Sequence, residues 1–199
     1  MSPSLTSADA AAFALTIAAG GVAVFPADTV YGLAAAPSDA AAVGRIYELK
    51  GRLPSKPAAL MWFDRERALF ALPSLGARTR AACERLLPGG VTLLLPDPDD
   101  AEAALGLRVP ALSGPLAALA AVELPVVQSS ANRSGGADPR TLAEVPREIR
   151  EGVDLVLDGG PLPGTSSTVI DLRRYEAGGA WEIVREGAVA RAAVAAALA

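Results

Sequence analysis

The sequence predicts an α/β protein built on an open, twisted, mixed sheet with flanking helices. Short apolar runs rich in Val and Leu, typical of buried strands, alternate with segments whose apolar residues recur at helical spacing. Clusters of Pro, Gly, Asp and Ser separate these segments, and neither a repeat nor a low-complexity linker interrupts the alternation. With 199 residues, 51% of them hydrophobic, the chain can bury one sizeable core. We therefore expect a single domain over residues 1–199.

The chain is organised around a buried strand and the loop that follows it. The apolar run over residues 22–25 is stopped by Pro26, which predicts a strand leading into a loop over residues 26–32, where chemistry could lie. A helix follows this loop and is treated below. The other elements expected in the first half are a helix from Thr6 or Ser7 to Gly20, a strand over 58–63, a short helix capped by Asp64, an amphipathic helix over 74–87 and a strand over 91–95.

The helix after this loop ends in three cations. Ser38 is its expected N-cap, and Gly51 follows its last turn. The cations are Lys50, Arg52 and Lys56, and these two lysines are the only ones among 18 basic residues. In a chain that otherwise uses arginine, a lysine indicates a position that needs the compact charge of an ammonium group instead of a planar guanidinium. The alternative is attraction of cations to the helix C-terminus, which accounts for Lys50 better than for Lys56.

The second half of the chain supplies two further candidates for a site. Arg108 lies in a short apolar strand over 106–109, so it is either the solvent-facing charge of an edge strand or a cation that faces inward. The strand over 125–127 runs into a polar, glycine-terminated loop over 128–136, which is where open α/β sheets place ligand groups. The remaining expected elements are helices over 115–122, 141–151 and 188–198 and strands over 153–157, 168–172 and 181–184.

Composition excludes several classes of function. The chain has no histidine, which removes Ser-His and Cys-His catalysis and histidine-containing zinc sites, so any general base must be a carboxylate, a lysine, the substrate or water. A net charge of −4 argues against a surface devoted to nucleic acid. The single cysteine, Cys83, fits a reducing compartment, and the apolar stretch over residues 10–25 is too short for a membrane span and lacks a basic flank. We therefore expect a cytoplasmic protein with no membrane role.

The common nucleotide-binding motifs do not occur in the sequence. Residues 159–166 read GGPLPGTS, but Thr165 stands where a phosphate loop has lysine and a strand follows instead of a helix, so a tight turn is the better interpretation. Neither G-x-G-x-x-G nor G-x-S-x-G occurs. What remains is a set of cations, hydroxyls and one amide near strand ends, which suits a polyanion with phosphoryl groups: Thr29, Lys50, Arg52, Lys56, Arg108, Ser130, Asn132 and Ser167.

Six segments resemble, in order, motifs of the YrdC-like family, the threonylcarbamoyl-AMP synthases. They extend over nearly the whole chain: PADTVYGL at 26–33, KGR at 50–52 with KP at 56–57, PGGVT at 88–92, RVP at 108–110, SSANRSG at 129–135 and SSTVIDL at 166–172. The resemblance implies an open α/β fold with a concave, positively charged cavity. It also implies a nucleotidyltransferase that condenses L-threonine, bicarbonate and ATP to threonylcarbamoyl-AMP and diphosphate, the first step toward N6-threonylcarbamoyladenosine in tRNA.

The resemblance also implies roles for individual residues. The catalytic group would be Lys50, Arg52, Ser130 and Asn132. The nucleotide would be bound by Arg52, Lys56, Ser130, Asn132 and Arg185. L-threonine would be held by Thr29, Arg108, Gln128 and Ser167. ATP is then a substrate, with Mg2+ expected beside it although the sequence shows no carboxylate cage for a metal, and a downstream tRNA threonylcarbamoyltransferase machinery would take the product.

The chain departs from the family pattern at five positions: Ala27, Met61, Gly90, Ala104 and Gln128. Two alternatives to the synthase therefore stay open. One is a paralogue that adenylates another carbamoyl acceptor, and the other is a double-stranded RNA-binding module. The net charge of −4 and the 5% aromatic content disfavour RNA binding as the principal role.

Overall fold

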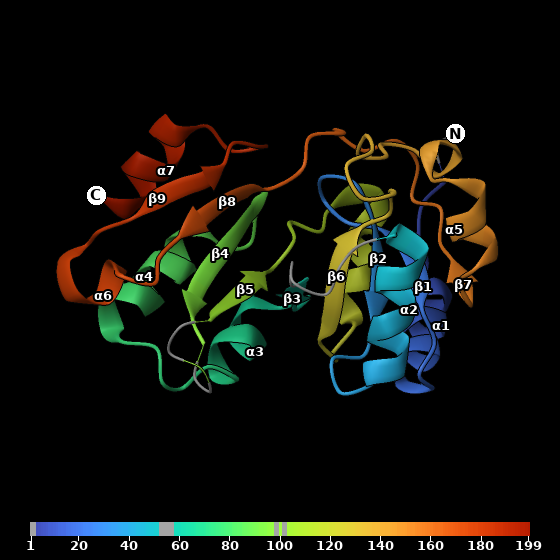
Figure 1. The fold of residues 1–199 in the computed structure, drawn as a ribbon, viewed down its shortest axis with the longest axis horizontal. Coiled ribbons are helices and arrows are strands. Elements are labelled where there is room, and N and C mark those ends of the chain that lie inside the picture. Colours follow the sequence, from blue (N-terminus) through green and yellow to red (C-terminus); the bar gives the residue numbers. More distant parts are fainter. Residues whose placement is uncertain (1–2, 52–57, 98–99, 101–102) are drawn as a thin grey trace.

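Two halves lie side by side along the long axis of the molecule (Figure 1). The computed structural model describes residues 3–51, 58–97, 100 and 103–199. The half with the N-terminus consists of α1 (Ser7–Ala18), β1 (Ala23–Pro26), β2 (Tyr31–Ala35), α2 (Ala40–Lys50), the 3-10 helix η1 (Gly114–Ala121), β6 (Val126–Ser130), the 3-10 helix η2 (Leu142–Glu144), α5 (Arg147–Glu151) and β7 (Leu155–Val156). The other half consists of β3 (Ala59–Met61), α3 (Arg65–Phe70), α4 (Ala77–Leu86), β4 (Val91–Pro96), β5 (Ala104–Arg108), β8 (Thr168–Asp171), α6 (Tyr175–Gly178), β9 (Glu182–Arg185) and α7 (Arg191–Leu198).

One mixed sheet runs through both halves. The nine strands of the described residues are hydrogen-bonded in the order β7-β1-β2-β6-β3-β5-β4-β8-β9. Three neighbouring pairs are parallel, namely β1 with β7, β3 with β5 and β4 with β8. The other pairs are antiparallel. The predicted fold, an open mixed α/β sheet with flanking helices, is therefore confirmed.

Capping groups explain where the first two helices begin and end. The Oγ1 of Thr6 accepts a hydrogen bond from the Asp9 N–H at 3.3 Å, and the Asp9 carboxylate accepts from the Thr6 N–H at 2.8 Å, so α1 begins with a reciprocal capping box. The N-cap of α2 is Asp39, whose carboxylate accepts from two N–H groups of the first turn, and not the expected Ser38 one residue earlier. Gly51 ends α2 in the left-handed conformation (φ 58°), as predicted.

Several segments differ from the sequence-based expectation because pairing or proline overrides the local pattern. Residues 31–32, expected in a loop, begin β2, which forms a hairpin with β1. Residues 128–130, also expected in a loop, are the last residues of β6 and pair with β2. The helix expected over 141–151 is divided at Pro146 into η2 and α5, since proline has no N–H for an interior helical hydrogen bond. The short helix α6 was not expected.

The half with the N-terminus buries apolar side chains on both faces of its strands. Alternate residues of β1 point to opposite faces, so Phe25 packs toward α1 while Val24 packs toward α2. Phe13 of α1 is fully buried beside Phe25 and Phe63, with ring centroids 5.0 and 5.6 Å away. This aromatic cluster links α1, β1 and the residues after β3.

We expect Phe13→Ala to lower the free energy of unfolding by about 3–5 kcal/mol, because it leaves a cavity among aromatic rings. Phe70→Ala is the matched control, since the Phe70 side chain is 88% exposed at the end of α3, and it should change stability by no more than about 0.5 kcal/mol. Urea denaturation followed by circular dichroism measures both. Equal losses for the two variants would show that the aromatic cluster does not stabilise the fold.

Candidate active site

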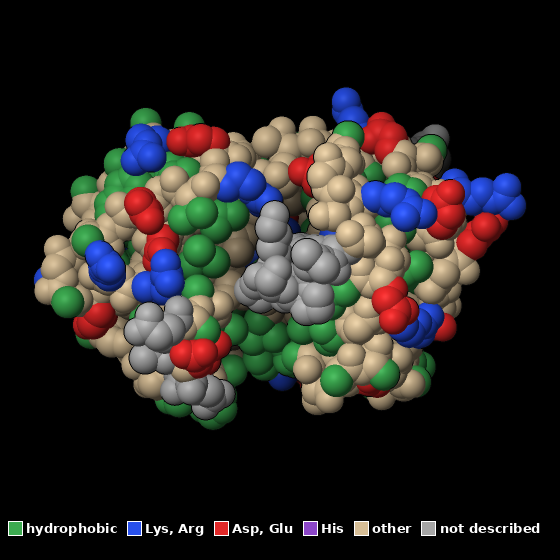
Figure 2. Space-filling model, viewed as in Figure 1, with side chains coloured by type: hydrophobic (Ala, Val, Ile, Leu, Met, Phe, Trp, Pro, Cys, Tyr) green, Lys and Arg blue, Asp and Glu red, His purple; other side chains and the backbone are tan. Residues whose placement is uncertain are grey.

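A cavity of about 450 Å3 lies where the two halves meet, and its lining comes from both. Figure 2 shows the surface hollowed in this region between the halves. The lining residues of a strand are mostly two positions apart, as for Ala104, Gly106 and Arg108 on β5 and for Gln128 and Ser130 on β6. Because alternate residues of a strand share a face, the cavity floor is one face of the sheet.

Arg108 is buried at the junction, with 3% of its surface exposed. It lies on β5, whereas its partners belong to the opposite half: Asp28 and Thr29 in the loop between β1 and β2, and Gln128 on β6. Its Nη2 donates to Asp28 Oδ1 at 2.7 Å and to Thr29 Oγ1 at 3.3 Å, and its Nη1 donates to Gln128 Oε1 at 3.3 Å. Its Nε is buried and has no hydrogen-bond partner within the described residues. The guanidinium therefore faces inward and keeps a donor unused.

Burial dominates the electrostatics of this ion pair. It raises the pKa of the Asp28 carboxyl above its ordinary value, against the opposing effects of Arg108 and of the Ala111 N–H. It also lowers the pKa of the Arg108 guanidinium, an effect that Asp28 opposes and the nearby Arg185 strengthens. An arginine nevertheless stays protonated in proteins. A buried positive charge with one carboxylate beside it thus lies at this end of the cavity.

Lys50 is a second buried cation, with 3% of its surface exposed. Its Nζ donates to the backbone oxygen of Ser130, to that of Asn132 at 2.9 Å and to Asn132 Oδ1 at 2.8 Å. An ammonium group has three N–H bonds, so these three acceptors satisfy it. The backbone oxygen of Lys50 also accepts from the Ser134 N–H at 2.8 Å. Lys50 therefore fastens the end of α2 to the loop that follows β6.

The side-chain amide of Asn132 completes this network. Its Oδ1 accepts from Lys50 and from the Ser130 hydroxyl at 2.7 Å. Its Nδ2 donates to the Gly136 backbone oxygen at 2.6 Å and to Asp138 Oδ1 at 3.3 Å. An asparagine side chain can accept twice and donate twice. Protein partners thus occupy the whole amide, which shapes the loop over residues 131–136.

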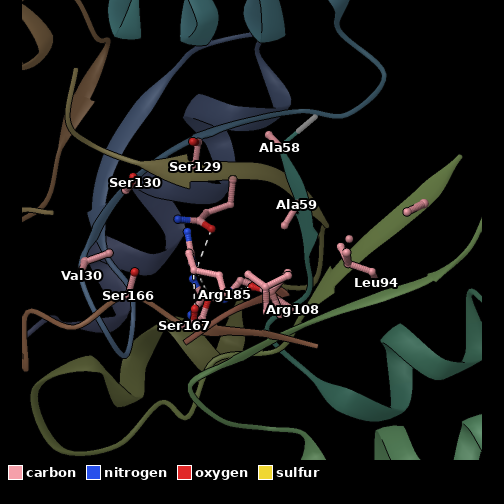
Figure 3. A pocket seen from close by; sticks show the side chains of 15 residues that line it. Val30, Ala58, Ala59, Leu94, Arg108, Ser129, Ser130, Ser166, Ser167 and Arg185 are labelled. Carbon is pink, nitrogen blue, oxygen red and sulfur yellow. Dashed lines mark hydrogen bonds between the residues drawn. The ribbon is translucent and has the colours of Figure 1, made fainter. Parts of the chain in front are cut away.

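A third polar group lines the cavity from the side of β4, β8 and β9. The hydroxyl oxygens of Ser167 and Thr92 are 2.7 Å apart. The Nη2 of Arg185 donates to the Ser167 backbone oxygen at 2.7 Å and to its Oγ at 3.4 Å. Figure 3 shows Ser167 and Arg185 beside Arg108, across the cavity from Ser130. Hydroxyls therefore face the cavity from both halves.

Hydrogen bonds also fix residues 158–167, over which the chain crosses from one half to the other. The hydroxyl of the buried Tyr31 lies 2.9 Å from Asp158 Oδ1. The Thr29 backbone oxygen accepts from the Gly164 N–H at 3.0 Å. Burial, with Asp158 adding to it, raises the pKa of the Tyr31 hydroxyl, which stays protonated. The loop between β1 and β2 thus holds both Arg108 and the crossing segment.

The predicted site residues fall into three groups in the structure. Those that line the cavity are Arg108, Gln128, Ser130, Ser167 and Arg185. Those hydrogen-bonded to lining residues are Thr29, Lys50 and Asn132. Those outside the described residues are Arg52 and Lys56. The structure thus brings together every predicted residue that it describes.

Four polar residues of the site were not predicted: Asp28, Thr92, Ser129 and Ser166. Asp28 belongs to a loop that had been singled out, and an acid in an otherwise apolar loop was a signal that could have been used. Thr92, Ser129 and Ser166 line the cavity, whereas Asp28 contacts the lining residue Arg108. Of the five departures from the family pattern, Ala104 and Gln128 lie in the lining. The unusual residues therefore include two that a ligand would meet.

The described part of the chain offers neither a protein-built metal site nor a spanning helix. It contains no group of three or more His, Cys, Asp or Glu side chains placed to hold a metal ion. None of its helices combines the length and the apolar character needed to cross a bilayer.

The chain belongs to the Sua5/YciO/YrdC family. The family model, described as "Telomere recombination", matches residues 16–187. A protein of Nitrosococcus oceani named threonylcarbamoyl-AMP synthase is 37% identical over 150 residues, which are 72% of this chain and 81% of that protein. One of Pyrococcus abyssi with the same name is 30% identical over 164 residues, 78% of this chain and 48% of that protein. The chain therefore spans about half the length of the Pyrococcus relative.

Solved structures share the fold. Pyrococcus abyssi Sua5 complexed with L-threonine matches with a TM-score of 0.77 at 29% identity, over 92% of this chain and 55% of that one. Escherichia coli YciO matches with a TM-score of 0.75 at 25% identity, over 94% of this chain and 93% of that one. The family that the six motifs predicted is thus confirmed by sequence and by structure.

Lys50→Met should lower the free energy of unfolding by about 3 kcal/mol, because it leaves three converging buried oxygens without their donor. Arg147→Met is the control for loss of a cation, since the Arg147 side chain is 78% exposed, and it should stay within about 0.5 kcal/mol of the parent protein. Chemical denaturation gives both values. If Lys50→Met were as stable as the control, the ammonium would not be holding the loop.

Proposed function

We propose that the protein is a threonylcarbamoyl-AMP synthase, which condenses L-threonine, bicarbonate and ATP to threonylcarbamoyl-AMP and diphosphate. One observation carries this proposal: a single cavity has a buried arginine with an unused donor at one end and a hydroxyl-bearing strand end, braced by a buried lysine, at the other. Relatives of that name, 30% and 37% identical over most of the chain, support it. The product would serve a downstream tRNA threonylcarbamoyltransferase machinery that forms N6-threonylcarbamoyladenosine.

Residues 1–199 would form one functional domain in the cytoplasm. A sheet that continues through both halves, with the cavity at their junction, supports a single unit. The only cysteine, Cys83, is buried and unpaired, which suits a reducing compartment.

Arg108 would bind the carboxylate of L-threonine. Its Nε is an unsatisfied buried donor, and such a group is stabilised by a ligand that accepts its hydrogen bond. Thr29 and Gln128 accept hydrogen bonds from its two Nη atoms and so help to fix the plane of the fork. Ser167, bonded to Thr92, would contact the rest of the amino acid from the facing strands. The solved complex of Pyrococcus abyssi Sua5 with L-threonine, which has the same fold, supports L-threonine as a ligand.

The nucleotide would contact Ser130 on one side of the cavity and Arg185 on the other. Ser130 lines the cavity, and Arg185 is a cation within hydrogen-bonding reach of the same lining. Arg52 and Lys56 would add charge at the phosphates, as the family resemblance implies. Lys50 and Asn132 would contribute to nucleotide binding and catalysis by shaping the loop, since their polar atoms are engaged within the protein.

The reaction would proceed through a carbamate. The threonine amine would attack CO2, or bicarbonate with loss of water, and a carbamate oxygen would then attack the α-phosphorus of ATP. The bond from that phosphorus to the bridging oxygen would break, and diphosphate would leave. The route needs no strong protein base, which suits a chain without histidine. Holding the reactants together is worth up to about 7–11 kcal/mol in well-oriented systems, and nearby cations stabilise charge that develops on phosphate.

Mg2+ would enter with the nucleotide. Because the described residues present no cluster of metal-ligating side chains, the phosphates of ATP and water would supply its ligands. The protein residues would then orient the nucleotide and not the metal.

Diphosphate release from ATP, with threonine and bicarbonate omitted in turn, tests the proposal. We expect release only with all three reactants, together with a product of the mass of threonylcarbamoyl-AMP. Release that depends on another amino acid and not on threonine would favour a paralogue, a second candidate that the departures from the family pattern at Ala104 and Gln128 in the cavity lining support. No ATP-dependent release, together with salt-sensitive binding of double-stranded RNA, would favour an RNA-binding module.

Substituting the two cavity arginines one at a time should separate binding of the amino acid from binding of the nucleotide. Arg108→Lys keeps the charge but loses the fork, so it should raise KM for threonine by about ten-fold or more and change KM for ATP little. Arg185→Lys should show the reverse pattern. Steady-state kinetics with each substrate varied measures both, and each variant is the control for the other. If both variants impaired ATP alone, Arg108 would bind the nucleotide and not the amino acid.

A further inference from the structure

Asp28 is the carboxylate that faces the buried arginine of the cavity. Among the ion pairs of the described residues, Asp28–Arg108 is the only one with both side chains almost fully buried, at 7% and 4% exposure. One carboxylate oxygen accepts from Arg108 Nη2 at 2.7 Å and the other from the Ala111 N–H at 3.0 Å. The negative charge is therefore held in place by two elements and cannot turn away from the guanidinium.

Among the described residues, the charged side chains that line the cavity are all positive. Within the described residues, the only ionised side chains in the lining are Arg108 and Arg185. Without Asp28 this end of the cavity would carry two uncompensated positive charges in a partly water-excluded space, where charges interact more strongly than in water. Any carboxylate or phosphate would then be attracted there. With Asp28, the excess falls to one charge.

Because Asp28 offsets part of the positive charge, this end of the cavity distinguishes ligands by how their own charges are distributed. A ligand whose only charge is a carboxylate is attracted by Arg108 but repelled by the carboxylate of Asp28, which is hydrogen-bonded to Arg108. A zwitterion brings an ammonium group as well, which Asp28 attracts and which offsets that repulsion. The discrimination acts through the field at the site, so direct contact of Asp28 with the ligand is not required.

We propose that Asp28 is a specificity-determining residue, whose carboxylate makes the Arg108 end of the cavity select a zwitterionic amino acid over a simple carboxylate anion. This inference rests on the proposed function, in which Arg108 holds the carboxylate of the amino-acid substrate. A purely structural Asp28 would instead fix Arg108 and Ala111 and affect all ligands alike.

The test compares two ligands that differ only in the amino group: L-threonine and (R)-3-hydroxybutyrate. Calorimetric titration of the full chain at neutral pH, with and without a non-hydrolysable ATP analogue, gives a Kd for each. The readout is the ratio of the two Kd values, because a substitution that weakens binding of both ligands equally leaves this ratio unchanged. In the parent protein we expect threonine to bind at least about ten-fold more tightly.

Asp28→Asn should reduce this preference by about ten-fold, through weaker binding of threonine, tighter binding of hydroxybutyrate or both. Asp28→Glu retains the charge and should keep most of the preference. Asp158→Asn is the matched control, since Asp158 contacts Tyr31 and the Gly160 N–H and not Arg108, and its ratio should equal that of the parent protein.

An unchanged ratio in Asp28→Asn, in a parent protein that binds threonine, would overturn this inference and leave the proposed function standing. If Asp28→Asn does not fold, the parent protein still decides: equal affinity for the two ligands overturns the inference, and the expected preference, kept in Asp28→Glu, supports it. A parent protein that binds neither ligand would overturn the proposed function and this inference with it.

Discussion

The burial of Arg108 between the two halves is the interaction on which the site depends. A guanidinium leaves water without a large penalty only where its charge and hydrogen bonds find partners. Here Arg108 comes from β5, and Asp28, Thr29 and Gln128 come from the opposite half. Because Asp28 also holds the backbone of Ala111, the loop between β1 and β2 is bound to the chain just beyond β5. The cavity is thus bounded by contacts that join the halves.

The second buried cation organises the other end of the cavity by different means. Lys50 directs three N–H bonds at oxygens of Ser130 and Asn132, which suits a compact ammonium and would not suit the planar fork of arginine. The left-handed Gly51 ends α2 where the side chain of Lys50 reaches the loop beyond β6. The chain uses arginine for nearly all of its cations, and the three converging oxygens explain why this position has a lysine instead.

The sequence was sufficient for features that depend on local pattern. The apolar context of Arg108 allowed either a solvent-facing charge or an inward-facing cation, and the structure shows the second; polar residues after an apolar run drew attention to Ser130. It was insufficient where partners lie far apart: β2 has small residues at most positions and is a strand because β1 and β6 pair with it. The role of Asp28 likewise depends on an arginine 80 residues away, and no local signal specifies that pairing. Arg52 and Lys56 remain predictions.

The hydrogen-bonding groups that the protein leaves available differ between the two ends of the cavity, so the two ends would recognise their ligands differently. At one end Arg108 retains a buried donor, Nε, so it has capacity for a ligand oxygen. At the other end, the side-chain amide of Asn132 and the ammonium of Lys50 are already saturated by the protein. Direct contact to a carboxylate would therefore determine binding at the arginine end. At the Ser130 end, ligand binding would depend on the conformation of the end of β6 and of the loop that follows it. A substitution of Lys50 or Asn132 would therefore affect the ligand by changing that conformation.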